Sequence, residues 1–133
     1  MSLGHATDTF TLGALIAELD DYARRIEDPA DSRVLYDFVH FHPKTLASYR
    51  GDYADLALGY GQVYSEAPKI AGLIEHLKGC VGRDFHGWKG GIYRASLATP
   101  VWVANPGETG STGIVGVQVM DGDVVLVTKK FVI

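Results

Sequence analysis

Apolar residues recur every three or four positions in two segments of the chain, which is the spacing that places side chains on one face of an α-helix. The first segment covers residues 11–28, where Thr11 suits the N-cap and Pro29 ends the helix. The second runs from Pro68, which suits a first helical turn, to about Lys78. The apolar faces consist of Leu12, Leu15, Ile16, Leu19, Tyr22 and Ile26 in the first segment and of Ile70, Leu73, Ile74 and Leu77 in the second. We therefore predict two amphipathic helices.

Runs rich in β-branched and aromatic residues predict strands around these helices. The predicted strands cover residues 33–41, 45–49, 56–60, 99–105, 114–120 and 123–132. Asp121-Gly122 separates the last two, and this pair is typical of a type I′ hairpin turn. Successive strands can pair as a meander. The pattern indicates an α+β fold with a twisted, mostly antiparallel sheet of about six strands and two helices on one face.

The length of 133 residues fits one domain, which we place at residues 11–133, with residues 1–10 as a disordered N-terminus or an expression remnant. The net charge of −4 argues against a polymeric nucleic acid as partner, because such partners require a basic face. Cys80 is the sole cysteine, which excludes an internal disulfide and fits a reducing cytoplasm. No stretch is apolar over the length that a bilayer requires. We therefore expect a cytoplasmic protein that binds no membrane.

One segment, Arg83-Asp-Phe-His-Gly-Trp-Lys-Gly-Gly-Ile-Tyr-Arg94, concentrates aromatic rings, cations and glycines. Glycine lets backbone N–H groups approach a ligand, lysine offers a cation with three donors, and aromatic rings offer faces on which a base can stack. A phosphorylated nucleotide requires these groups. The ligand-binding residues predicted here are Phe85, Trp88, Lys89, Gly90 and Tyr93. The alternative is that Phe85 and Trp88 are core residues beside a glycine-rich hairpin turn.

Two further residues are ligand-binding candidates. Arg50 is flanked by Tyr49 and Tyr53, and an arginine between aromatic rings can stack and still present its planar fork to a phosphate. Its alternative role is a salt bridge to a neighbouring aspartate. Asn105 follows an apolar strand and either contacts the ligand or shapes the turn before Pro106.

The sequence contains no pattern that singles out a catalytic or metal site. His40 and His42 share a face of a predicted strand, but no third ligand stands at a recognisable spacing. The Gly-x-Ser-x-Gly elbow and the phosphate-binding Gly-x-x-x-x-Gly-Lys-Ser/Thr loop are both missing. We therefore predict no catalytic residue, no metal and no cofactor. A phosphodiesterase that uses His86 or the His40/His42 pair is kept as an alternative.

Three strings of residues together resemble a known family. They are Tyr49-Arg-Gly-Asp-Tyr-Ala-Asp-Leu-Ala-Leu58, Phe85-His-Gly-Trp-Lys-Gly-Gly-Ile-Tyr93 and Thr99-Pro-Val-Trp-Val-Ala-Asn105, of which the central one is the most specific. Their order and spacing are similar to those of the first Thoeris anti-defence family, phage proteins that sequester immune signalling nucleotides. The resemblance spans most of the chain, from the helix at Thr11 to the terminal hairpin.

This resemblance implies that the chain sequesters a cyclic ADP-ribose isomer or another small cyclic nucleotide without cleaving it, as a homodimer or homohexamer. It implies Phe85 as the base-stacking ring and Arg50 as a phosphate ligand. Ile92 departs from the pattern, since an acidic residue is expected there. The further arginine candidates are Arg24, Arg25 and Arg94, and a second site for cyclic oligonucleotides falls on Gly110, Ser111 and Thr112.

A third class of function has no ligand at all. In this alternative the chain is a non-catalytic protein-interaction module, with Trp88 and Trp102 as interface anchors. A response to added nucleotide separates the binding protein from this module, and recovery of the nucleotide unchanged separates it from the phosphodiesterase.

Overall fold

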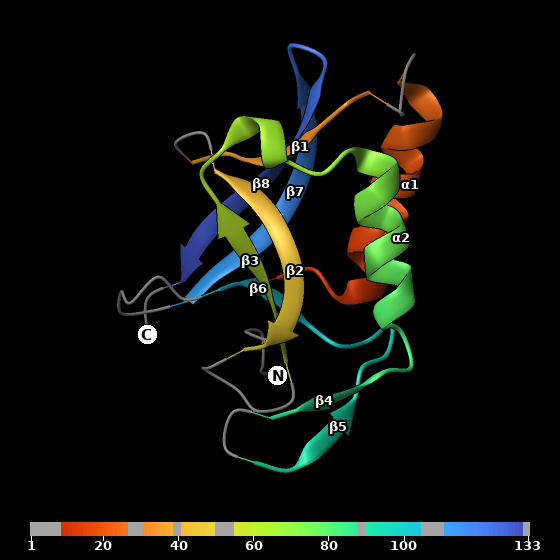
Figure 1. The fold of residues 1–133 in the computed structure, drawn as a ribbon, viewed down its shortest axis with the longest axis vertical. Helices are drawn as coiled ribbons and strands as arrows, with labels where there is room; N and C mark the ends of the chain where they lie inside the picture. Colours follow the sequence, from red (N-terminus) through yellow and green to blue (C-terminus); the bar gives the residue numbers. More distant parts are fainter. Residues whose placement is uncertain are drawn as a thin grey trace.

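The computed structural model describes residues 9–26, 31–38, 41–49, 55–87, 90–104 and 111–131. Within them the elements follow the order α1 (Leu12–Arg25), β1 (Val34–Tyr36), β2 (His42–Ser48), β3 (Leu56–Gly61), the 3₁₀ turn η2 (Tyr64–Glu66), α2 (Ile70–Cys80), β4 (Asp84–His86), β5 (Ile92–Arg94), β6 (Val101–Val103), β7 (Ser111–Met120) and β8 (Asp123–Phe131). Six of these strands form one sheet, and β4 and β5 form a separate hairpin (Figure 1). The predicted α+β class is confirmed.

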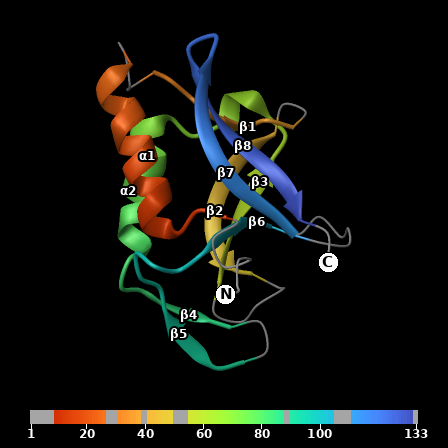
Figure 2. The same cartoon turned by 180° about the vertical axis from the view of Figure 1, so that it is seen from behind.

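Both predicted helices are present and lie side by side on one side of the sheet (Figure 2). Thr11 caps α1, since its hydroxyl oxygen accepts a hydrogen bond from the Ala14 N–H at 3.1 Å. α2 begins at Ile70, two residues after Pro68, and ends at Cys80. The apolar helix faces meet the inner face of the sheet in one core, to which the sheet contributes Leu56, Leu58, Val101, Val103, Ile114 and Leu126.

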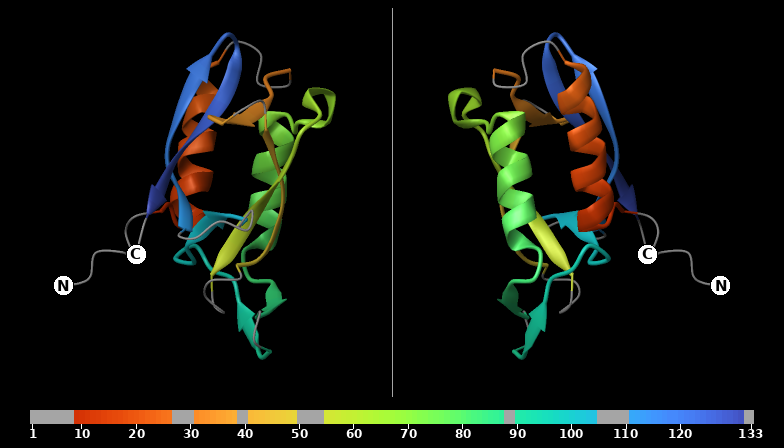
Figure 3. Two further views of the ribbon diagram at one scale, coloured as in Figure 1. Left: turned by 90° about the vertical axis from the view of Figure 1, so that its left-hand side faces the viewer. Right: turned by 90° about the vertical axis from the view of Figure 1, so that its right-hand side faces the viewer.

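The strand order is β1-β8-β7-β6-β3-β2, so the sheet is not the sequential meander that the sequence suggested. β1 pairs with β8 and β3 pairs with β6 in parallel, while the other pairs are antiparallel. Between β3 and β6 the chain makes α2 and the β4–β5 hairpin, and a parallel pair needs such a long crossover. The end strands β1 and β2 contact each other, so the sheet curls towards a barrel (Figure 3).

Two local features separate the observed strands from the predicted ones. The strand expected over residues 33–41 ends at Tyr36, because the chain turns back there: the Phe41 N–H donates to the Phe38 carbonyl at 3.1 Å. β2 then starts at His42 rather than at residue 45. The terminal hairpin is as predicted, and the positive φ angles of Asp121 (52°) and Gly122 (84°) are those that a type I′ turn requires.

Candidate functional site

The structure separates the predicted ligand-binding residues into two places. Phe85, Gly90 and Tyr93 belong to the β4–β5 hairpin, whereas Thr112 lies in β7. The residues Arg50, Trp88, Lys89, Asn105 and Gly110, together with the side chain of Ser111, lie outside what the structure describes. Their roles remain predictions.

Phe85 is a core residue, as the alternative interpretation had it. Its side chain is 8% exposed and belongs to the same apolar cluster as the helix leucines. The ring stacks on Tyr93 at a centroid distance of 5.9 Å, and the guanidinium of Arg83 lies 5.0 Å from the ring centroid. These two neighbours cover the ring, so in this conformation Phe85 offers no open face to a base.

The glycine-rich turn and Tyr93 hold the hairpin together and attach it to the sheet. The Gly87 N–H donates to the Gly91 carbonyl at 2.9 Å and the Gly90 N–H donates to the Gly87 carbonyl at 3.0 Å, so these amides do not point at a phosphate. The Tyr93 hydroxyl lies 2.9 Å from the Ser48 hydroxyl and donates to the Asp55 carbonyl at 3.0 Å. The described amides of this hairpin therefore hold the turn together, and the Tyr93 hydroxyl attaches the hairpin to the sheet, so these groups do not form an anion site.

The phosphodiesterase alternative relies on three histidines, of which the structure describes His42 and His86. His40 lies outside the described residues, and His86 is exposed on β4. His42 is 1% exposed, and its Nδ1 lies 2.9 Å from the Pro43 carbonyl, so Nδ1 carries the proton. Its Nε2 is buried against Gly61, where an added Cβ would come within 2.7 Å. Both ring nitrogens of His42 are therefore covered in this conformation.

His76 and Cys80 are close neighbours on α2 but do not form a reactive pair. The Sγ of Cys80 lies 4.0 Å from Nε2 of His76. That nitrogen already accepts the Leu46 backbone N–H at 3.0 Å, so it is not free to take the thiol proton. Burial raises the pKa of the Cys80 thiol, with partial compensation by Arg83, so the neutral thiol dominates. Cys80 is therefore not a nucleophile with an available base.

The contact between His76 and Leu46 predicts a pH-dependent stability. Desolvation, assisted by the charge of Arg83, lowers the pKa of His76 below 6.5. The unfolded chain therefore binds more protons than the folded chain as the pH falls below about 6.5, so stability is retained above that pH and lost below it. We expect the free energy of unfolding in urea to fall between pH 7.5 and pH 5. His76→Gln keeps an acceptor but does not titrate, and an unchanged pH slope in this variant would contradict the assignment.

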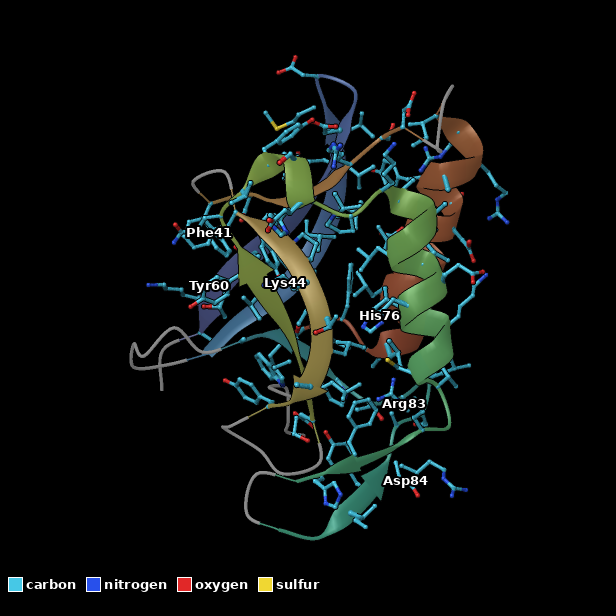
Figure 4. All side chains as sticks on the ribbon, viewed as in Figure 1. Phe41, Lys44, Tyr60, His76, Arg83 and Asp84 are labelled. Carbon is cyan, nitrogen blue, oxygen red and sulfur yellow. The ribbon has the colours of Figure 1, made fainter. Side chains whose placement is uncertain are left out.

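The described residues enclose an aromatic pocket at the end of the sheet that is remote from α2. It has a volume of about 310 Å³ and is lined by Phe38, Phe41, Tyr60, Val103, Ala104, Thr112, Thr128 and Lys130. We call it the aromatic pocket. Phe41 and Tyr60 lie on the side of the molecule far from α2 (Figure 4). Tyr60 lies on the same face of β3 as the core residues Leu56 and Leu58, because residues two apart in a strand point to one side. The pocket therefore continues the inner face of the sheet beyond the core.

Stacked rings make the wall of the aromatic pocket stiff. Tyr36 stacks on Phe38 at 4.8 Å, Phe38 meets Phe41 edge to face at 5.4 Å, and Phe41 stacks on Tyr60 at 5.4 Å. The buried end of this row of rings is fixed by Tyr36. Its hydroxyl shares one proton between the Leu58 and Gly59 carbonyls, at 3.1 and 2.9 Å. Burial also raises the pKa of Tyr36 well above its ordinary value, which keeps this hydroxyl protonated. Such a wall offers pre-ordered apolar surface to a planar ligand.

The lining residues with polar side-chain groups come from β3, β7 and β8, and they are Tyr60, Thr112, Thr128 and Lys130. Thr112, predicted as part of a second site, is among them. The Thr128 hydroxyl donates a hydrogen bond to the Asp37 carboxylate, and Lys130 is a charged residue of the lining. Sequence reasoning missed all the lining residues except Thr112. The only feature of the sequence that could have indicated this pocket was the pair of rings Phe38 and Phe41, which follow an apolar strand.

A second hollow of about 440 Å³ lies between β2 and α2, lined in part by His42, Lys44, Glu66 and His76. Figure 4 shows Lys44 and His76 on the two sides of this cleft. Within the described ranges no three His, Cys, Asp or Glu side chains are placed to share a metal ion. The cleft therefore lacks the ligand set of a metal centre in the part of the chain that can be described.

No helix among the described residues has the length and apolar character needed to cross a membrane.

Comparison with known proteins gives no assignment of function, so the fold and the pocket are the basis for one. Neither a family model, nor a curated protein, nor a solved structure matches the chain.

Proposed function

We propose that the protein is a non-catalytic binding protein for a small phosphorylated nucleotide of the cyclic ADP-ribose type, the ligand class that the resemblance to the Thoeris anti-defence family implies. The observation that carries this proposal is the aromatic pocket with Lys130 beside its rings. The base lies against Phe41 and Tyr60, and the phosphates remain near the ammonium group of Lys130. Stacking and a nearby cation are the two interactions that such a ligand needs.

The size of the aromatic pocket supports one bound ring system. Its volume of about 310 Å³ lies at the lower end of the range for small-molecule sites, roughly 300–1,000 Å³. The ribose and phosphate groups of such a nucleotide therefore extend out of the pocket. Thr112 lines it, so we propose that Thr112 belongs to this site instead of a separate one, while Gly110 and the side chain of Ser111 lie outside the described residues. Arg50, Lys89 and Asn105 remain candidates for the phosphate groups.

Sequestration without cleavage is supported by the state of three side chains, His42, His76 and Cys80. Hydrolysis of a phosphodiester needs a nucleophile and a base within hydrogen-bond reach, and His42, His76 and Cys80 are each buried or already engaged. We therefore propose that the nucleotide leaves the protein unchanged. In keeping with the resemblance, we further propose a cytoplasmic homodimer or homohexamer, which light scattering tests.

One experiment separates the three classes of function. The protein is titrated with cyclic ADP-ribose isomers in a calorimeter, then denatured by heat, and the supernatant is analysed by chromatography. A saturable heat with intact nucleotide in the supernatant supports the proposal. A converted nucleotide supports the phosphodiesterase, and a titration without heat for any isomer supports the protein-interaction module with Trp102 as an anchor.

A further inference from the structure

The cleft between β2 and α2 is lined by two opposite charges that the fold leaves unpaired. Lys44 from β2 and Glu66 from η2 both line the cleft, and both are exposed. Among the described residues the ion pairs involve neither of them. The cleft shares no lining residue with the aromatic pocket. Its charged groups are therefore available to a ligand of their own.

His76 adds a hydrogen-bond donor to this cleft. The Leu46 N–H donates to Nε2 of His76 at 3.0 Å, so in the neutral ring Nδ1 carries the proton. Desolvation by burial, together with the charge of Arg83, lowers the pKa of His76 and so keeps the ring neutral at pH 7. The side chain lies on the side of α2 that faces β2 (Figure 4). Its Nδ1–H makes no hydrogen bond to another described residue, so it can donate to an anionic group.

The acceptor Glu66 and the donor His76 lie towards opposite ends of the cleft. Glu66 precedes Ile70, the first residue of α2, whereas His76 lies about 9 Å beyond Ile70 along the helix axis. Between the two ends the lining includes the apolar side chain of Leu73. Gly72 leaves open space there, since an added Cβ would meet no atom within 4 Å. A molecule that fills the cleft therefore needs a positive end, an apolar middle and a negative end.

We infer that this cleft binds a short peptide of about three residues with both ends free, an activity beyond the nucleotide binding proposed above. The terminal carboxylate accepts from Nδ1–H of His76 and from the ammonium group of Lys44, and the terminal ammonium donates to Glu66. An apolar side chain of the peptide lies over Gly72. An extended tripeptide spans about 10 Å, which suits the separation of the two ends, whereas a free amino acid carries its charges on neighbouring atoms.

Calorimetry with the full chain at pH 7 and the tripeptide Ala-Leu-Ala tests this inference. The free tripeptide should bind at least about fivefold more tightly than its N-acetylated form or its C-terminal amide, because each modification removes one charge. Free leucine should also bind at least about fivefold more weakly than the tripeptide. Equal dissociation constants for the three forms of the tripeptide, or no heat with any of them, would overturn the inference.

Two substitutions assign the ends of the peptide. Glu66→Gln should weaken the free tripeptide and leave the N-acetylated form unchanged, because that form has no ammonium to lose a partner. Lys44→Met keeps the apolar stem without the charge, and it should weaken the free tripeptide and leave the amide unchanged. Glu75→Gln removes a carboxylate from the exposed part of α2 outside the cleft lining and should change none of these affinities. A loss by the same factor for every form of the tripeptide would contradict the assignment.

Gly72→Leu closes the cleft without removing a charge. Leucine favours a helix more than glycine does, and the space beside Gly72 is open, so the midpoint of thermal unfolding should be unchanged or higher. Binding of Ala-Leu-Ala should be lost, while nucleotide binding in the aromatic pocket persists. Phe41→Ala should show the reverse, so the two proposals fail separately. A folded Gly72→Leu variant that binds Ala-Leu-Ala as the unsubstituted protein does would overturn the inference.

Discussion

Phe41→Ala should weaken nucleotide binding by roughly fivefold to hundredfold, the largest effect on function that we expect from a single substitution. The ring lines the aromatic pocket and stacks on Tyr60 at 5.4 Å, so its removal deprives the base of one flat surface and loosens the other. The measurement is the dissociation constant for cyclic ADP-ribose, determined by calorimetry.

Two matched variants control this prediction. Phe41→Leu keeps most of the apolar volume but has no flat face, so it should preserve stability and still lose most of the affinity. Tyr64→Leu removes a ring that is 49% exposed on η2, outside the aromatic pocket, and should leave affinity unchanged. Unchanged affinity in Phe41→Ala would show that the base binds elsewhere.

Phe85→Ala should lower the free energy of unfolding by about 3 kcal/mol and the midpoint of thermal unfolding by roughly 10 °C. The physical reason is its place in the core, where the ring packs between Tyr93 and Arg83 and joins the β4–β5 hairpin to the base of the helices. Thermal unfolding followed by circular dichroism measures the change.

Ile92→Ala provides the comparison on the same hairpin. Ile92 is directly opposite His86 in the hairpin and 65% exposed, so its truncation should change the stability by less than about 0.5 kcal/mol.

The Phe85→Ala variant should also bind nucleotide with nearly the affinity of the unsubstituted protein, as long as it is folded. A variant that unfolds at the normal temperature but no longer binds would restore the base-stacking role that the sequence suggested for Phe85.

The local parts of the fold could be predicted from the sequence, because local signals determine them. The cap at Thr11, the apolar face of α2 and the Asp121-Gly122 turn each depend on residues within a few positions of one another. The parallel pairs β1–β8 and β3–β6 join segments that are far apart in the chain. No periodicity carries that information, so the strand order could not be derived.

The candidate site was difficult to predict for the same reason. The aromatic segment around Phe85 is conspicuous in the sequence, but the Phe85 ring stacks on Tyr93 and is buried in the core. The aromatic pocket is assembled from the ends of β3, β6, β7 and β8 together with the turn after β1. One hydrogen bond of a lining residue joins Thr128 to Asp37 across 91 positions of the chain. Only the three-dimensional pairing of the strands brings these residues together.

The hydrogen bond from Leu46 to His76 has a consequence for how the protein behaves at high concentration. β2 is the last strand of the sheet, and an outer strand with unpaired amides can recruit the same strand of another molecule. The imidazole of His76 occupies one such amide, and α2 stands in front of it. Acidification puts a proton on this nitrogen and turns it from an acceptor into a donor. The Leu46 N–H then loses its hydrogen-bond partner at the edge of β2. Because the pKa of His76 is lowered from 6.5, storage or crystallisation at a pH well below 6.5 should favour intermolecular β-pairing and turbidity, which His76→Gln should suppress.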